Sequence, residues 1–208
     1  NSEMKKIASL SLLMFLSVFA LFACGNDETV NNQKNETNQE TSEYPKTLTD
    51  GRGEEVTLKE KPSRIVSTTL AIDEYLLPLV DEERIAAVTK MSTDSGISNV
   101  ADLTEGIDTK IESVTSELVL SLQPDLVLIP SYVDPEVLKQ IDAAGITTYQ
   151  LKDDSSISGV LDGLMEVGTI VGEEDKAEEI IADVKKRMSD LQKKAEAETE
   201  KKRVVYWT

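Results

Sequence analysis

Short apolar runs alternate with amphipathic stretches through most of the chain. The run PDLVLIP lacks the alternation of a half-buried strand, which is expected when both faces of a strand are covered. Strands separated by helices typically form a parallel sheet with right-handed crossovers. The sequence therefore predicts an α/β lobe with a four-stranded parallel sheet flanked by helices. The predicted strands are residues 64–68, 84–89, 124–130 and 146–151, and the predicted helices are residues 72–80, 116–122, 134–145 and 155–172.

Residues typical of helix ends support these boundaries. Thr115 or Ser116 can cap the helix that contains SELVLSL, because a hydroxyl accepts a hydrogen bond from a free backbone amide. Pro135 suits the first turn of the next helix, and Gly145 suits its end. The segment KTLTDGRGEEVTL before the lobe predicts a β-hairpin that turns at Asp50-Gly51. A G-x-G begins at Gly51, but a dinucleotide motif would need a third glycine and a following helix.

The stretch 173–202 contains neither glycine nor proline and has a helical stripe of apolar residues. It predicts one helix of about 40 Å, since each residue adds about 1.5 Å. A coiled coil is the alternative, but the stripe becomes polar after about two heptads. The last residues, RVVYWT, predict a buried strand. Because a strand is not stable alone, we expect residues 203–208 to begin a second lobe that the sequence does not include.

The amino-terminal residues have the three parts of a secretory signal. Lys5 and Lys6 are basic, the run from Ile7 to Ala23 is uncharged, and the only cysteine of the chain, Cys24, follows. We interpret residues 1–23 as a signal peptide and residues 24–43 as a polar linker. The sequence LFAC resembles the bacterial lipobox, which implies lipid attachment at Cys24. A buried core cysteine is the alternative, but Cys24 borders a polar segment.

Composition excludes several functions. The formal net charge of −17 disfavours nucleic acids and anionic headgroups as partners. The chain has no histidine, which excludes a Ser-His-Asp relay and a histidine-ligated zinc or haem site. We therefore predict no catalytic residue, no metal ligand and no enzyme activity. A lipid-anchored hydrolase would need a nucleophile elbow and a histidine, and the sequence has neither.

The order of several segments resembles a known family. TLTDGRGEEVTL, KPSRIVS, SELVLSLQPDLVLI, AAGITTYQL and VGTIVGEEDKAEEIIADV follow the lipobox in turn. This order resembles the solute-binding lipoproteins of ABC importers for ferric siderophores, haem and cobalamin. The resemblance implies two lobes joined by one rigid helix, with the first lobe at residues 44–171, the helix at residues 172–202 and the second lobe from residue 203. It also implies a monomer that serves an ABC permease dimer and its ATPase, held by its lipid on the outer face of the bacterial cytoplasmic membrane.

The resemblance also implies a role for Glu117. This residue matches an acidic residue of the family that pairs with an arginine of the permease. An exposed carboxylate paired with a guanidinium would orient the two proteins. An acidic residue at a helix start is also favoured by the helix dipole, and both explanations can hold.

Sheet topology predicts where a ligand would bind. Ligands of open parallel sheets lie beyond the carboxyl ends of the strands. Tyr132 offers an aromatic face and a hydroxyl, and Lys90 and Lys152 could meet anionic oxygens of a chelate. Each of these residues could equally be an ordinary loop residue. The predicted ligand-binding residues are Ser67, Thr68, Thr69, Lys90, Met91, Ser92, Ser131, Tyr132, Lys152 and Asp153.

The predicted ligand is a small-molecule metal chelate and not a resident cofactor. A preformed chelate needs only shape, aromatic surface and a few hydrogen bonds from the protein. The absence of histidine disfavours histidine-ligated haem and sites for bare zinc or manganese. A ferric siderophore is therefore the first expectation and a corrinoid such as cobalamin the second. A surface sensor on the same scaffold is a more distant alternative.

Overall fold

The computed structural model describes residues 44–198, Arg203 and residues 205–207. The predicted signal peptide, Cys24 and the linker therefore lie outside the described residues. Each predicted strand and helix of the lobe is confirmed, with ends shifted by a few residues. The elements are β1 (Lys46–Thr49), β2 (Glu55–Leu58), β3 (Ile65–Ser67), α2 (Leu70–Leu76), β4 (Ile85–Thr89), β5 (Lys110–Ile111), α3 (Ser116–Leu122), β6 (Leu126–Ile129), α4 (Pro135–Ala143), β7 (Thr148–Gln150), α5 (Ile157–Val171) and α6 (Glu174–Ala197).

The central sheet has five parallel strands in the order β5-β4-β3-β6-β7. The prediction of four strands was wrong by one. The additional strand, β5, consists of only two residues and pairs with the end of β4. An apolar pattern cannot identify so short a strand, because its position depends on the neighbouring backbone.

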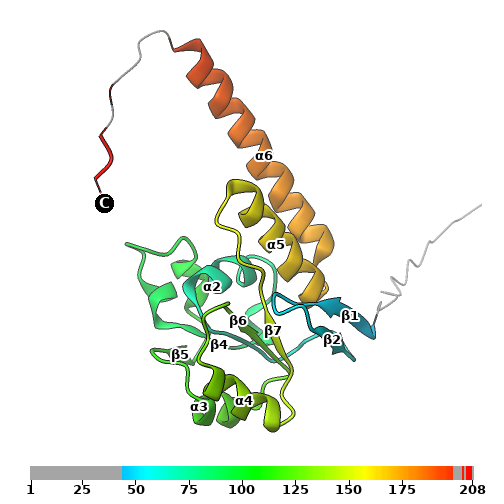
Figure 1. Cartoon of the computed structure of the whole chain (residues 1–208). Coiled ribbons are helices and arrows are strands. Elements are labelled where there is room, and N and C mark those ends of the chain that lie inside the picture. Colours follow the sequence, from blue (N-terminus) through cyan, green and yellow to red (C-terminus); the bar gives the residue numbers. More distant parts are fainter. Residues whose placement is uncertain (1–43, 199–202, 204, 208) are drawn as a thin grey trace, which may run out of the picture. The chain divides into compact units, whose positions relative to one another are not determined.

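Helices cover both faces of the sheet, with α2 and α5 on one side and α3 and α4 on the other (Figure 1). Strand β6 shows how the core is divided. Leu126 and Leu128 belong to the cluster that packs under α2 and α5, whereas Val127 and Ile129 belong to the cluster that packs under α3 and α4. Successive side chains of a strand point to opposite faces. The unbroken apolar run in the sequence is therefore explained by a strand that is buried on both sides.

Capping residues fix the helix starts. Thr115 caps α3, because its hydroxyl accepts a hydrogen bond from the Leu118 amide at 3.3 Å. Asp134 caps α4 in the same way, with Pro135 as the first helical residue. Gly145 has a φ of 75° directly after α4, a conformation that suits glycine. These findings confirm the predicted boundaries and place the loops that connect the strands to the helices.

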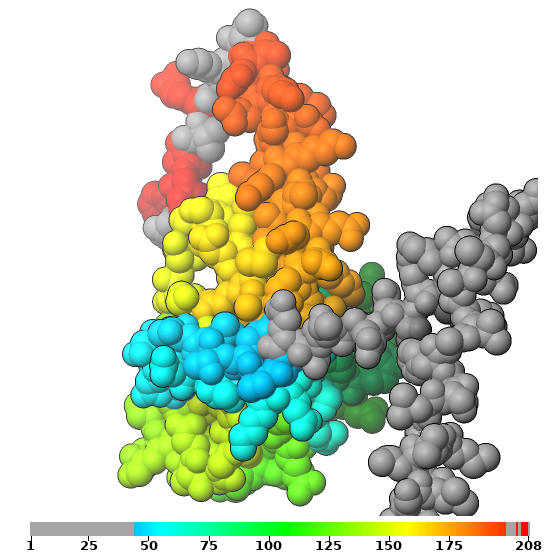
Figure 2. Space-filling model, turned by 90° about the vertical axis from the view of Figure 1, so that its right-hand side faces the viewer, coloured from blue at the N-terminus to red at the C-terminus, as the bar shows by residue number. Residues whose placement is uncertain are grey.

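The β1–β2 hairpin is antiparallel, as predicted, and its turn attaches to the sheet. The Gly51 amide donates a hydrogen bond of 2.7 Å to the carbonyl of Gln150 in the edge strand β7. A Cβ on residue 51 would lie 2.6 Å from the Leu151 carbonyl oxygen, so the close approach requires glycine. Figure 2 shows the hairpin in light blue against the start of α6 in orange, where Lys46 forms an ion pair of 2.5 Å with Glu174.

Helix α6 has 24 residues, which corresponds to about 36 Å. It therefore ends earlier than predicted. Its first turns pack on α5 through the buried side chains of Ala177 and Ile181. Further along the helix, Met188 and Leu191 of the same apolar stripe are exposed. In the part of the chain that the structure describes, no helix has the length and apolarity needed to cross a membrane.

Among the residues that the structure describes at the end of the chain, the predicted strand is not seen. Arg203 and residues 205–207 belong to neither a helix nor a strand, and the side chains of Val205, Tyr206 and Trp207 are exposed. A strand needs a neighbour to satisfy its backbone groups. None of the described strands pairs with these residues.

Candidate functional site

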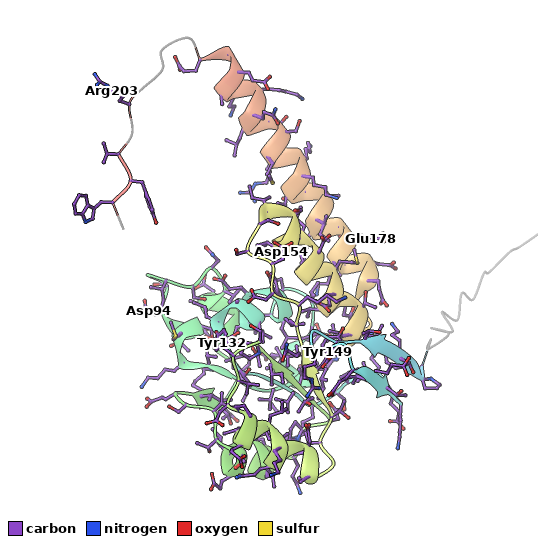
Figure 3. The ribbon with its side chains drawn as sticks, in the orientation of Figure 1. Asp94, Tyr132, Tyr149, Asp154, Glu178 and Arg203 are labelled. Carbon is purple, nitrogen blue, oxygen red and sulfur yellow. The ribbon has the colours of Figure 1, made fainter. Side chains whose placement is uncertain are left out.

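Parallel pairing brings the predicted ligand-binding residues to one edge of the sheet. Strands β4, β3, β6 and β7 are neighbours in that order, so the residues after their carboxyl ends lie side by side. We call these residues the carboxyl edge. Figure 3 shows Asp94, Tyr132 and Asp154 on the side of the lobe away from the hairpin. The carboxyl edge comprises residues 67–69 at the end of β3, 90–94 after β4, 131–132 after β6 and 152–154 after β7.

The hydroxyls that follow β3 are used within the lobe. Thr68 is almost fully buried and donates a hydrogen bond of 2.8 Å to the Leu128 carbonyl. Thr69 caps α2 by accepting a hydrogen bond from the Ile72 amide. Ser67 is completely buried. These three side chains therefore stabilise the loop that follows β3, whereas the sequence suggested them as donors to a ligand.

Asp73, which the sequence analysis did not select, is the centre of this support. It lies on α2, is completely buried, and accepts a hydrogen bond of 3.0 Å from the Thr89 amide. Thr89 also donates its hydroxyl to the same carboxylate oxygen. Ser92 donates to the Thr89 carbonyl at 2.7 Å. Asp73 thus links α2 to the end of β4 and to the turn that presents Lys90 and Met91.

The environment of Asp73 disfavours its charge. Burial raises the pKa of Asp73 above its ordinary value, and the hydrogen bonds from Thr89 oppose this shift without cancelling it. Oδ1 of Asp73 has no hydrogen-bond partner among the described residues. The next residue of α2, Glu74, is also an acid, so no sequence signal singled out Asp73.

Both lysines of the carboxyl edge are paired with glutamates. Lys90 forms an exposed ion pair with Glu112, and hydrogen bonding from Lys90 lowers the pKa of Glu112. The Lys152 ammonium lies 3.7 Å from the Glu166 carboxylate of α5. From the sequence, these lysines were expected to contact an anionic chelate. Their partners Glu112 and Glu166 come from other elements, so local sequence does not reveal them.

The carboxyl edge exposes two large side chains, Met91 and Tyr132, among charged and polar ones. The side chain of Met91 is 56% exposed and that of Tyr132 is 78% exposed. Ile97, Ile157 and Val160 are also exposed, and the latter two stand on the first turn of α5, directly beyond β7. Ser131 donates a hydrogen bond of 3.1 Å to Asp153, which holds the loops after β6 and β7 together.

A groove of about 420 Å³ lies beside the carboxyl edge, between β1, β7 and α5. In its wall, the Tyr149 hydroxyl lies 3.0 Å from both the Thr49 carbonyl and the Glu166 carboxylate. Its single proton can be donated to only one of them at a time. Burial, followed by the charge of Glu166, raises the pKa of Tyr149. The groove is lined by Leu48, Thr49, Tyr149, Lys152, Asp162, Met165, Glu166 and Thr169.

Glu117 lies on the opposite face of the sheet from α2 and α5. It is the second residue of α3 and is exposed, whereas its neighbour Ser116 is buried. The structure therefore places Glu117 where a partner protein could reach it. It does not test the predicted contact.

A family model described as periplasmic binding protein matches residues 65–208. The chain belongs to this family. Among the relatives of this periplasmic binding protein, the "Uncharacterized ABC transporter substrate-binding lipoprotein YvrC" of Bacillus subtilis (strain 168) is 30% identical over 92% of the chain and 60% of the relative. The "Probable siderophore-binding lipoprotein YfiY" of the same organism is 27% identical over 95% of the chain and 59% of the relative.

The "Cobalamin-binding protein" of Halobacterium salinarum is 26% identical over 71% of the chain and 40% of its own length. The chain thus spans 60% or less of each of these relatives. Among solved structures, the "heme binding protein HmuT" superposes with a TM-score of 0.56 and 26% identity, over 75% of the chain and 50% of its own length. The predicted family and fold are confirmed.

Proposed function

We propose that this periplasmic binding protein captures a metal chelate outside the cytoplasm, most favourably a ferric siderophore, and delivers it to an ABC permease. The observation that carries the proposal is the family match over residues 65–208. The relative named as siderophore-binding, which aligns with 95% of the chain, supports this choice of ligand. Cobalamin is the second candidate, supported by the cobalamin-binding relative. The protein would act by capture, without catalysis.

The ligand would bind at the carboxyl edge, against a second lobe supplied by the rest of the complete protein. The carboxyl edge exposes the side chains of Met91 and Tyr132. A chelate with an organic shell needs such apolar and aromatic surface for binding. The buried hydroxyls of Ser67 and Thr68, together with Asp73, would hold the backbone of this edge in place. Glu117, on another face, would remain accessible to the permease.

A binding titration on the complete reading frame, purified without its lipid, tests this function. Intrinsic fluorescence is followed against a ferric hydroxamate, a ferric catecholate, haemin and cyanocobalamin. Saturable binding of one iron chelate supports iron uptake, and binding of cyanocobalamin alone supports the second candidate. The absence of binding to all four would overturn the proposed function.

The proposed anchor is the lipid on Cys24, at the outer face of the cytoplasmic membrane. Two of the relatives are named as lipoproteins, which supports this proposal. Cys24→Ala removes the thiol that the lipid would occupy, and we expect the variant to appear in the culture medium. Fractionation of cells and detergent-phase partitioning measure this. Continued partitioning of the variant into detergent would contradict lipid attachment at Cys24.

A further inference from the structure

The charges at the carboxyl edge indicate which chelates this lobe accepts. The residues that directly follow β4 and β7 include two cations, Lys90 and Lys152, and both are paired with glutamates. A lysine that already pairs with a carboxylate offers little net positive charge to a ligand. The paired lysines therefore leave the edge without a cationic site for an anionic chelate.

The arginines of the lobe lie elsewhere. Within residues 44–172, which the structure describes in full, Arg52, Arg64 and Arg84 are all bound near the amino ends of the strands. Arg52 pairs with Asp50 in the hairpin turn. Arg64 donates to the Leu122 carbonyl, and Arg84 donates to the Val171 carbonyl. The guanidinium groups that would best bind anionic oxygens are thus at the opposite end of the sheet.

Acidic side chains remain exposed at the carboxyl edge. Asp153 follows β7 and accepts only the neutral hydroxyl of Ser131 among the described hydrogen bonds. Asp154 accepts the Ser156 amide, and Asp94 accepts the Gly96 amide. All three carboxylates are exposed, and they belong to the same carboxyl edge as the exposed side chains of Met91 and Tyr132. The exposed surface of the edge therefore combines three carboxylates with the large side chains of Met91 and Tyr132.

We propose that the carboxyl edge selects a chelate with a neutral or cationic, apolar outer surface, and disfavours multiply anionic chelates. A ferric hydroxamate and a corrinoid share this chemistry, whereas a ferric tricatecholate does not. The inference rests on the proposed function, because it requires that a chelate binds at this edge. It narrows the ligand within that function.

The test compares affinities on the complete protein by isothermal titration calorimetry. The probes are a cationic ferric trihydroxamate, cyanocobalamin, which is neutral, and an anionic ferric tricatecholate. We expect one of the first two to bind at least about tenfold more tightly than the tricatecholate, a difference of about 1.4 kcal/mol. The probe that binds also shows whether the ligand is a hydroxamate or a corrinoid. Tighter binding of the tricatecholate would overturn this inference but leave the proposed function standing, whereas no binding of any probe would overturn both.

Variants that remove charges distinguish the effect of the carboxylates at the edge on affinity from the effect of the protein's net charge. If the trihydroxamate binds, the double variant Asp153→Asn, Asp154→Asn should weaken its binding several-fold at low salt, with a smaller effect at high salt. If cyanocobalamin binds, the double variant should reduce the difference between its affinity and that of the tricatecholate. Glu60→Gln removes an exposed charge after β2, at the other end of the sheet, and should change neither affinity. Equal effects of the two charge removals would contradict a role for the carboxyl edge.

Discussion

Single residues of this lobe have roles that depend on their surroundings. Asp73 is one of many acids in the sequence, yet it is completely buried and holds the end of β4. Glu112 and Glu166 matter because they pair with Lys90 and Lys152 and offset their positive charges. Sequence reasoning placed Lys90 and Lys152 at the correct edge but could not supply their partners.

The buried Asp73 predicts a pH-dependent stability. Burial raises its pKa above the ordinary carboxyl value of 3.8, so the folded protein holds this proton more tightly than the unfolded chain does. The resulting stabilisation is complete below the ordinary pKa and is lost as the pH rises through the raised pKa. Asp73→Asn cannot ionise, so the stability of the variant relative to the wild type should rise from acid to neutral pH.

Urea unfolding of both complete proteins at several pH values between about 4 and 8 measures this difference. Asp162→Asn, which changes an exposed carboxylate of α5, is the control. A stability difference that stays constant across the pH range would contradict the role assigned to Asp73. Glu112 is exposed, so its ion pair should contribute little to the result.

Among the elements, α5 and α6 pack closely at their junction. A Cβ on Gly168 would lie 2.6 Å from the Ala177 Cβ. Glu173, at the start of α6, accepts a hydrogen bond of 2.6 Å from Arg84 and pairs with Lys61 at 3.0 Å. The base of α6 is thus held both by close packing and by ion pairs. The helix can therefore act as a stiff extension of the lobe.

Gly168→Ala tests this packing. Alanine is favoured over glycine within a helix by up to about 1 kcal/mol, but the added methyl group would overpack the α5–α6 contact at a cost of about 1–3 kcal/mol. We expect a net loss of about 1–2 kcal/mol in the free energy of unfolding, measured by urea denaturation. Asp162→Ala, at an exposed position of the same helix, should change stability by less than about 0.5 kcal/mol. A stabilised Gly168→Ala variant would show that the contact tolerates a methyl group.

At the scale of the whole molecule, the proposed ligand edge and the proposed docking residue come from different elements of the lobe. The carboxyl edge follows β3, β4, β6 and β7, whereas Glu117 is exposed on α3. A binding protein needs this separation, because the permease must recognise the loaded protein without displacing the ligand. Charge at a docking surface contributes to orientation and association rate more than to affinity.

Glu117→Arg should therefore reduce uptake of the ligand by cells while leaving its affinity in solution unchanged. Transport assays and titrations on the same variant measure the two effects. Glu136→Arg is a matched control, because Glu136 is also an exposed acid at the second position of a helix, α4. Both substitutions lose the same interaction with the helix dipole. Equal uptake by the two variants would contradict a docking role for Glu117.

The sequence by itself determined the family, the order of strands and helices, and the edge at which the predicted ligand-binding residues meet. These properties follow from local patterns: apolar runs, capping residues such as Thr115, and turns at glycines such as Gly145. Only the tertiary structure decided what each residue at that edge can do. It added the two-residue strand β5, buried Ser67 and Ser92 around Asp73, and paired both lysines with glutamates. The physical reason is that burial and charge pairing depend on contacts between segments far apart in the chain, which no local pattern records.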